Sequence, residues 1–182
     1  MKLPLKKNMG LIHVYTGEGK GKTTSSLGIA LRAVGHGYKV YIVQFLKGWK
    51  EAGEWKIQER LKPHLQVFQF GQPEPVDLVT PSPTDIYLAN EGLNFSRKVV
   101  QDRKKRPDVL IMDEVNVAVA AEMIALKEML DFVDNIPSNM ELVLTGRSAH
   151  PDIVERAHLV TEMRPVKHYY DGPIGRRPGI DH

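Results

Sequence analysis

The stretch GLIHVYTGEGKGKTTSSLGIALRAVGHG, residues 10–37, decides the fold of this chain. It begins with a short apolar run at 10–16 that is typical of a buried strand. The next segment, 17–21, holds too much glycine for the interior of a helix or a strand. From Lys22 onward, apolar residues recur at three- and four-residue steps, which predicts a helix that ends at Gly35-His36-Gly37. We therefore expect a strand, a glycine-rich turn and a helix in succession.

The rest of the chain continues this alternation of strands and helices. Because the expected strands are continuous apolar runs, they predict an α/β fold with a mostly parallel sheet and helices on both faces. In such folds, ligands bind beyond the carboxyl ends of the strands. The four prolines of 71–83 predict an irregular loop. Further strands are expected at 39–45, 65–70, 108–113, 141–145 and 158–162, and helices at 54–61, 84–106 (capped by Thr84), 122–133 and 151–156.

Composition limits the class of protein. The 182 residues are 42% hydrophobic and 26% charged, which fits one globular domain. The absence of cysteine excludes disulfide scaffolds, zinc–thiolate sites, iron–sulfur clusters and cysteine nucleophiles. A net charge of +3 fits an anionic ligand without requiring nucleic acid. We expect a basic arm at 1–8 and a single domain at 9–182, whose tail, from about 164 to 182, wraps on the surface.

The glycine-rich turn has the composition of a phosphate-binding loop. Glycines let backbone N–H groups converge on phosphate oxygens, and the helix that follows offers unpaired N–H donors. Lys22 is expected to reach the terminal phosphates, and Thr23 to hold Mg²⁺. The usual motif, G-x-x-x-x-G-K-[ST], requires glycine at 16, where this chain has Thr16. The loop is thus one residue tighter, and we expect the phosphates to sit differently from those in an ordinary nucleotide hydrolase.

Two other interpretations of the turn are weaker. A merely glycine-rich turn with a solvated lysine would rarely fall at a strand-to-helix junction. A dinucleotide-binding fingerprint would require glycine at 22, and an acidic residue in place of Gln44 and Phe45 at the end of the second strand.

Charged residues follow other strands. Asp113 and Glu114 end a buried strand and are expected to serve Mg²⁺ rather than only to cap a helix, although spacing leaves open which of them contacts the metal. Arg147 follows the strand at 141–145 and either neutralises phosphate charge or lies in a surface turn. Spacing does not decide whether Arg32 faces a ligand. The basic run at 103–106 is interpreted as a solvated helix end rather than a nucleic-acid patch.

These segments resemble one family. The opening stretch, whose one-residue shift the family shares, occurs together with Gly53-Glu54, LIMDEVN at 110–116, LTGR at 144–147, LVTEMRPVKH at 159–168 and Gly179-Ile180-Asp181. Together they resemble the P-loop ATP:corrinoid adenosyltransferases of the cob(I)alamin or cob(I)yrinic acid a,c-diamide type. The resemblance implies a RecA-like P-loop domain, a cytoplasmic homodimer, and transfer of the 5′-deoxyadenosyl group of ATP to Co(I) of a reduced corrinoid. Triphosphate would leave as a unit, in cobalamin biosynthesis or salvage.

The resemblance also implies partners and site residues. The partners are ATP, Mg²⁺, the reduced corrinoid and an electron-donating flavoprotein, with no membrane or nucleic acid. Catalysis is assigned to Lys22 and Arg147. Mg²⁺ is assigned to Thr23 and Glu114, with Asp113 beside them. Nucleotide binding is assigned to Gly17, Glu18, Gly19, Lys20, Gly21, Lys22, Thr23, Thr24, Arg32 and Arg147.

Two segments depart from the family. An aromatic segment that faces the corrin usually follows the third strand, but here that place holds GQPEPVD at 71–77, with Phe68 and Phe70 just before it. Near the C-terminus, an alanine-glutamine stretch is replaced by GRRP at 175–178. Two alternatives therefore stand beside the enzyme: an ATP- and corrinoid-binding module with altered catalysis, and a RecA-like ATPase that acts on nucleic acid.

Overall fold

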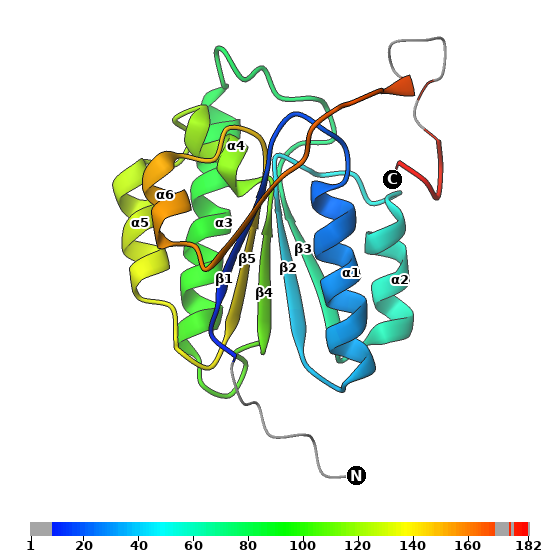
Figure 1. Cartoon of the computed structure of the whole chain (residues 1–182), viewed down its shortest axis with the longest axis vertical. Coiled ribbons are helices and arrows are strands. Elements are labelled where there is room, and N and C mark those ends of the chain that lie inside the picture. Colours follow the sequence, from blue (N-terminus) through cyan, green and yellow to red (C-terminus); the bar gives the residue numbers. More distant parts are fainter. Residues whose placement is uncertain (1–8, 170–174, 176, 182) are drawn as a thin grey trace.

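The computed structural model describes residues 9–169, 175 and 177–181. Its centre is a six-stranded sheet of order β3-β2-β4-β5-β1-β6, in which every paired strand is parallel to its neighbour (Figure 1). The strands are β1 (Ile12–Thr16), β2 (Val40–Phe45), β3 (Leu65–Phe70), β4 (Val109–Asp113), β5 (Glu141–Thr145) and β6 (Leu159–Glu162). The helices are α1 (Lys22–Gly35), α2 (Gly53–Leu61), α3 (Pro83–Gln101), α4 (Val115–Ala120), α5 (Leu126–Asp134) and α6 (Pro151–Arg156).

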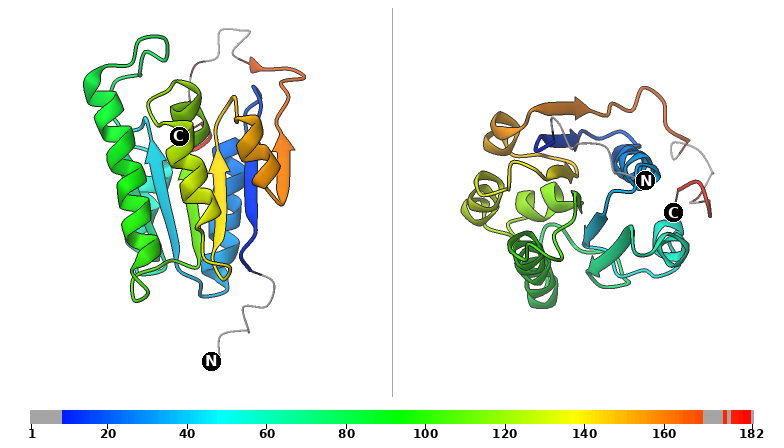
Figure 2. Two further views of the ribbon diagram at one scale, coloured as in Figure 1. Left: turned by 90° about the vertical axis from the view of Figure 1, so that its left-hand side faces the viewer. Right: turned by 90° about the horizontal axis from the view of Figure 1, so that it is seen from below.

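Helices cover both faces of the sheet, as the continuous apolar strands predict. Helices α1 and α2 lie on one face, and α3, α4, α5 and α6 lie on the other (Figures 1 and 2). All six residues of β2 are buried, because side chains on both of its faces meet helices. The α/β prediction is confirmed, and the sheet is wholly rather than mostly parallel.

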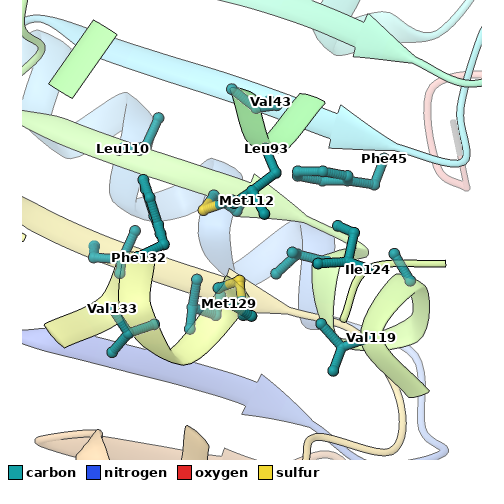
Figure 3. Close-up of a cluster of buried hydrophobic side chains, with 14 of the residues drawn as sticks. Val43, Phe45, Leu93, Leu110, Met112, Val119, Ile124, Met129, Phe132 and Val133 are labelled. Atoms are coloured by element: carbon teal, nitrogen blue, oxygen red, sulfur yellow. The ribbon is translucent and has the colours of Figure 1, made fainter. Parts of the chain in front are cut away.

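The larger core lies between the sheet and α3, α4 and α5. Phe45 and Met112 from the strands meet Leu93 of α3, while Met129 and Phe132 come from α5 (Figure 3). Full burial of each such side chain stabilises the fold by roughly 1.5–3 kcal/mol. This packing fixes the strands, and all their carboxyl ends lie at the same edge of the sheet.

The long helix α3 differs from the prediction at both ends. Ser82, not Thr84, is its cap: the Ser82 hydroxyl accepts from the backbone N–H of Asp85, and the Asp85 carboxylate accepts from the N–H of Ser82. The helix ends at Gln101 rather than 106, because the Asp102 carboxylate accepts from the N–H groups of residues 104 and 105 and so stabilises a turn. The basic run at 103–106 is therefore a turn, with its first three residues exposed, rather than the end of a helix.

The helix expected at 122–133 begins later than predicted: α5 starts at Leu126 and ends at Asp134. A second helix, α4, precedes it and was not predicted, and Glu122 lies between the two with a left-handed φ of 56°. The residues of α4, VNVAVA, are mostly buried and carry no amphipathic period, so periodicity does not reveal them. Among the residues that the structure describes, no helix has the length and apolar character needed to span a membrane.

Candidate functional site

The glycine-rich turn joins β1 to α1 at the carboxyl edge of the sheet. Gly17 and Gly21 have φ values of 90° and 122°, which residues with a Cβ rarely adopt. The turn also presses against the chain after β6: a Cβ at Gly19 would lie 2.8 Å from the carbonyl carbon of Met163. The N–H of Gly19 donates to the carbonyl of Met163 at 2.7 Å, so this one amide is engaged within the protein. The glycines thus serve both backbone conformation and close packing.

Lys22 is bound to its own loop. Its ammonium donates to the carbonyl oxygens of Gly17 and Gly19, at 2.7 and 2.8 Å, and the residue is 7% exposed. Burial lowers the pKa of Lys22, while the nearby Glu114 carboxylate works in the opposite direction. The side chain is thus held against the loop at the start of α1, and its contact with terminal phosphates stays a prediction.

Asp113, the last residue of β4, is fully buried at the centre of the site. Its Oδ1 accepts from the hydroxyls of Thr23 (2.8 Å) and Thr145 (2.7 Å). Its Oδ2 accepts from the ammonium of Lys47 (2.7 Å) and the amide of Gln44 (3.2 Å). Burial alone would raise the pKa of Asp113, but the Lys47 charge and these hydrogen bonds hold it below its usual range. The carboxylate is ionised and has four donors around it.

Glu114 directly follows Asp113 in the sequence, but its carboxylate has different hydrogen-bonding surroundings. Its backbone is left-handed, with φ 65°, and its N–H donates to the hydroxyl of Thr145. Across the described ranges 9–169, 175 and 177–181, no residue donates a hydrogen bond to its carboxylate. Burial raises the pKa of Glu114; Lys47 opposes this shift and Asp113 adds to it. Glu114 therefore keeps the free lone pairs that Asp113 lacks.

This donor set fits Mg²⁺. The Thr23 hydroxyl donates its hydrogen to Asp113 and so keeps lone pairs for a cation, and Glu114 adds an oxygen. In the part of the chain that the structure describes, no group of three His, Cys, Asp or Glu side chains is placed to hold a metal. Mg²⁺ does not need such a group, because it usually takes one or two protein oxygens and completes its shell with phosphates and water.

Two further predicted residues lie around the loop. The Arg147 guanidinium pairs with Glu18 at 3.0 Å, and both side chains are largely exposed. Lys20 lies 3.4 Å from Asp181 in the tail and donates to the Ile180 carbonyl. Thr24 is exposed in the first turn of α1. The structure thus brings 17–24, Asp113, Glu114 and Arg147 to one edge of the sheet.

Arg32 does not join this group within one chain. It lies ten residues beyond Lys22 on α1, which at about 1.5 Å per residue is roughly 15 Å along the axis. It lines a shallow hollow with His36 and with Val109 and Glu141, the first residues of β4 and β5. These residues mark the amino edge of the sheet, opposite the loop.

Sequence reasoning missed Lys47, Gln44 and Thr145. All three lie at or just after the carboxyl end of a strand, where ligands of parallel sheets gather. That rule, applied to β2 and β5, would have drawn attention to them. It would not have shown that they meet Asp113, since this depends on the order of strands in the sheet.

The two aromatics before 71–77 face the core. The rings of Phe68 and Phe70 lie 4.4 and 5.4 Å from the ring of Phe95 on α3. Exposed apolar side chains appear further along, at Leu78, Val79, Ile86 and Tyr87. If an apolar surface faces a ligand here, it comes from these later residues rather than from Phe68 or Phe70.

Comparison with known proteins gives one consistent family. Residues 8–182 match the family described as ATP:corrinoid adenosyltransferase BtuR/CobO/CobP. The chain is 36% identical over 173 residues to the corrinoid adenosyltransferase of Escherichia coli K12. That alignment covers 95% of this chain and 86% of the Escherichia coli protein. For the protein named corrinoid adenosyltransferase CobA of Salmonella typhimurium the identity is 35%, with the same coverage. For the corrinoid adenosyltransferase of Pseudomonas aeruginosa the identity is 32%, covering 94% and 83%.

A solved structure supports the fold alone. The flagellar accessory protein FlaH from Methanocaldococcus jannaschii aligns with a TM-score of 0.56 at 16% identity. The alignment covers 85% of this chain and 71% of FlaH. This likeness agrees with a RecA-like P-loop domain.

Proposed function

The chain belongs to the ATP:corrinoid adenosyltransferase family, and from this membership we propose that it transfers the 5′-deoxyadenosyl group of ATP to the cobalt of a reduced corrinoid, within cobalamin metabolism. The observation that carries the proposal is the shifted glycine loop, with Lys22 held inside it and Thr23 bound to Asp113.

The proposed reaction does not require a side chain to act as a general base. Co(I) supplies the electron pair that forms the bond to C5′ of the ribose. The C5′–O bond breaks, its electrons leave with the triphosphate, and the cobalt becomes Co(III). No side chain has to be deprotonated, which accounts for a site that has cations and hydroxyls but no nucleophile paired with a base. The work of the protein is to align the two substrates and to stabilise the charge of the departing triphosphate.

We assign Mg²⁺ to Thr23 and Glu114. When bound, it would neutralise part of the triphosphate charge. Asp113 orients the Thr23 hydroxyl rather than serving as a ligand, because its four lone-pair positions already accept hydrogen bonds. Lys22 and Arg147 supply positive charge at the loop and at its mouth.

Other parts of the proposal rest on the family resemblance. They are a homodimer, a cytoplasmic location and a flavoprotein that delivers the electron for Co(I). One alternative keeps a specific observation in its favour: the altered segment at 71–77 allows a module that binds ATP and corrinoid without transfer. Tight corrinoid binding without formation of a Co–C bond would identify that module.

The test is adenosylcorrinoid formation by Lys22→Ala. Removing one cation from the developing triphosphate charge should cost about 2–4 kcal/mol, or roughly 30- to 1,000-fold in turnover. Chemically reduced corrinoid and MgATP are mixed with the protein, and the visible spectrum follows the new Co–C bond.

Lys62→Ala is the matched control, since Lys62 pairs with the exposed Glu59 at the end of α2, and the substitution should leave turnover unchanged. Turnover by Lys22→Ala equal to that of the unmodified protein would show that the loop is assigned wrongly.

A further inference from the structure

Lys47 stands directly after β2 on a tightly built turn. Leu46 has a left-handed φ of 59°, and its N–H donates to the carbonyl of Phe70. The backbones of this turn and of the residues after β3 touch closely: a Cβ on Gly48 would lie 2.4 Å from the oxygen of Gly71, and one on Gly71 would lie 2.2 Å from the N of Lys47. The backbone of Lys47 is therefore fixed, so its side chain starts from a defined place at the carboxyl edge of the sheet.

The ammonium of Lys47 lies where a triphosphate is expected. It donates to Asp113 at 2.7 Å and lies 3.5 Å from the hydroxyl of Thr23. Thr23 itself directs its hydrogen to the other oxygen of Asp113. An ammonium has three hydrogens, and the contacts with Asp113 and Thr23 use at most two of them. Within the described residues, one N–H of Lys47 therefore has no hydrogen-bond partner, next to the residue assigned to Mg²⁺ and phosphate.

Asp113 does not depend on Lys47 for its orientation. The two threonine hydroxyls and Gln44 already hold both of its oxygens. Neutralising a buried carboxylate is one role for Lys47, and it uses one hydrogen of the ammonium. The remaining N–H groups and the 3.5 Å distance to the Thr23 hydroxyl point to a second partner on the phosphate loop.

Lys47 and Lys22 reach the site from different strands and are held by different partners. Lys22 follows β1, Lys47 follows β2, and the sheet order places β4 and β5 between these two strands. A polyphosphate chain bound by the glycine loop and Thr23 would therefore lie near both ammonium groups. Two cations on separate elements can stabilise charge along an extended leaving group better than two on a single loop.

We infer that Lys47 is a second cation of the triphosphate site, whose ammonium donates to the departing triphosphate while Asp113 holds it in place. This rests on the proposed function, because it takes the glycine loop to be the triphosphate site. It extends that function to a residue outside the loop and identifies the end of β2 as part of the leaving-group pocket.

The test is binding of inorganic tripolyphosphate, measured by calorimetry in EDTA, so that no metal or corrinoid contributes. Lys47→Met should bind at least tenfold more weakly than the unmodified protein, and Lys47→Arg should recover most of the affinity. The affinity of Lys47→Met should also depend less steeply on salt concentration, because one charge that contacts the ligand is gone. Lys62→Met, which removes a distant exposed cation, should match the unmodified protein in both respects.

The double variant Lys47→Met/Asp113→Asn separates binding from folding, since it removes the buried carboxylate together with its counter-ion. We expect it to regain stability to urea without regaining affinity for tripolyphosphate.

Three outcomes decide the inference. If Lys47→Met or the double variant folds and binds tripolyphosphate as the unmodified protein does, with an unchanged salt dependence, the inference is wrong. If the unmodified protein binds neither tripolyphosphate nor ATP, the proposed function itself fails. If Lys22→Ala alone loses affinity, the function stands and Lys47 is only a counter-ion.

Discussion

Asp113 and Glu114 show how two adjacent carboxylates acquire different roles. Asp113 ends a central strand and accepts four hydrogen bonds, whereas Glu114 has a left-handed backbone and accepts none on its carboxylate from the described residues. Sequence spacing left open which of them contacts the metal. The surroundings favour Glu114, because its carboxylate keeps lone pairs that no described residue occupies, whereas those of Asp113 accept hydrogen bonds.

Glu114→Gln should therefore stabilise the ligand-free protein at neutral pH while abolishing adenosyl transfer. The folded-state pKa of Glu114 lies above its unfolded value, so stability falls as the pH rises from the unfolded value, about 4.3, through the folded value. Glutamine removes this loss. Urea unfolding in EDTA at pH 7 should show the variant more stable than the unmodified protein, and the difference should disappear at pH values below about 4.

An exposed glutamate, Glu155 on α6, gives the matched control, because Glu155→Gln should change neither stability nor turnover appreciably. A Glu114→Gln protein that is less stable at pH 7 would mean that the carboxylate is held by favourable contacts, against the geometry described above.

At the residue level, the sequence predicts site residues that are consecutive better than site residues that the fold brings together from different strands. The glycines, Lys22 and Thr23 are consecutive, so their spacing alone predicts a phosphate loop. Lys47 and Thr145 lie far from Thr23 in sequence and meet it or Asp113 only because β2 and β5 flank β4. No local pattern contains that information.

Among the elements, α3 packs closely against the sheet because one of its residues is a glycine. Gly92 faces β2 and β3, and a Cβ there would lie 2.8 Å from Cε1 of the buried Phe45 and 3.2 Å from Cβ of Phe70. Figure 3 shows Phe45 beside Leu93, within the same packed cluster. The glycine thus allows α3 to approach the sheet closely, next to the turn that carries Lys47.

Gly92→Ala should destabilise the protein by about 1 kcal/mol. Overpacking costs about 1–3 kcal/mol, and the gain in helix propensity from glycine to alanine offsets only about 1 kcal/mol of it. The measurement is the free energy of unfolding in urea. The control is Gly28→Ala on α1, where nothing lies within 4 Å of the added Cβ and the same gain in propensity should stabilise by about 0.5–1 kcal/mol. Equal effects at the two positions would rule out the close contact with Phe45.

The elements themselves follow from the sequence where one local signal dominates. The strands at 65–70 and 141–145 and the helix at 151–156 have the predicted bounds, because apolar runs or a proline mark their ends. Side-chain capping decides the ends of α3, and a choice between Ser82 and Thr84 depends on which hydroxyl meets the N–H of Asp85. The short helix α4 is buried and nearly all apolar, so no periodicity distinguishes it from a strand or a loop.

On the scale of the whole molecule, the C-terminal tail lies against the glycine-rich loop after β1. Asp181 lies beside Lys20 of the phosphate loop and also contacts Arg177 and Tyr169. The residues expected at 164–182 to wrap the surface are largely exposed where the structure describes them, while the arm at 1–8 lies outside the described residues. Of the replaced stretch 175–178, residues 175, 177 and 178 are exposed. The described part of the C-terminal tail thus contacts the loop after β1.

We propose that the loop holds ATP so that C5′ of the ribose, rather than the terminal phosphorus, meets the attacking group. Phosphorus NMR of a reaction that contains the protein, MgATP and chemically reduced corrinoid tests this proposal directly. We predict one inorganic tripolyphosphate for each adenosylcorrinoid formed, without ADP. ADP and orthophosphate in its place would show attack at the terminal phosphorus and would contradict the account.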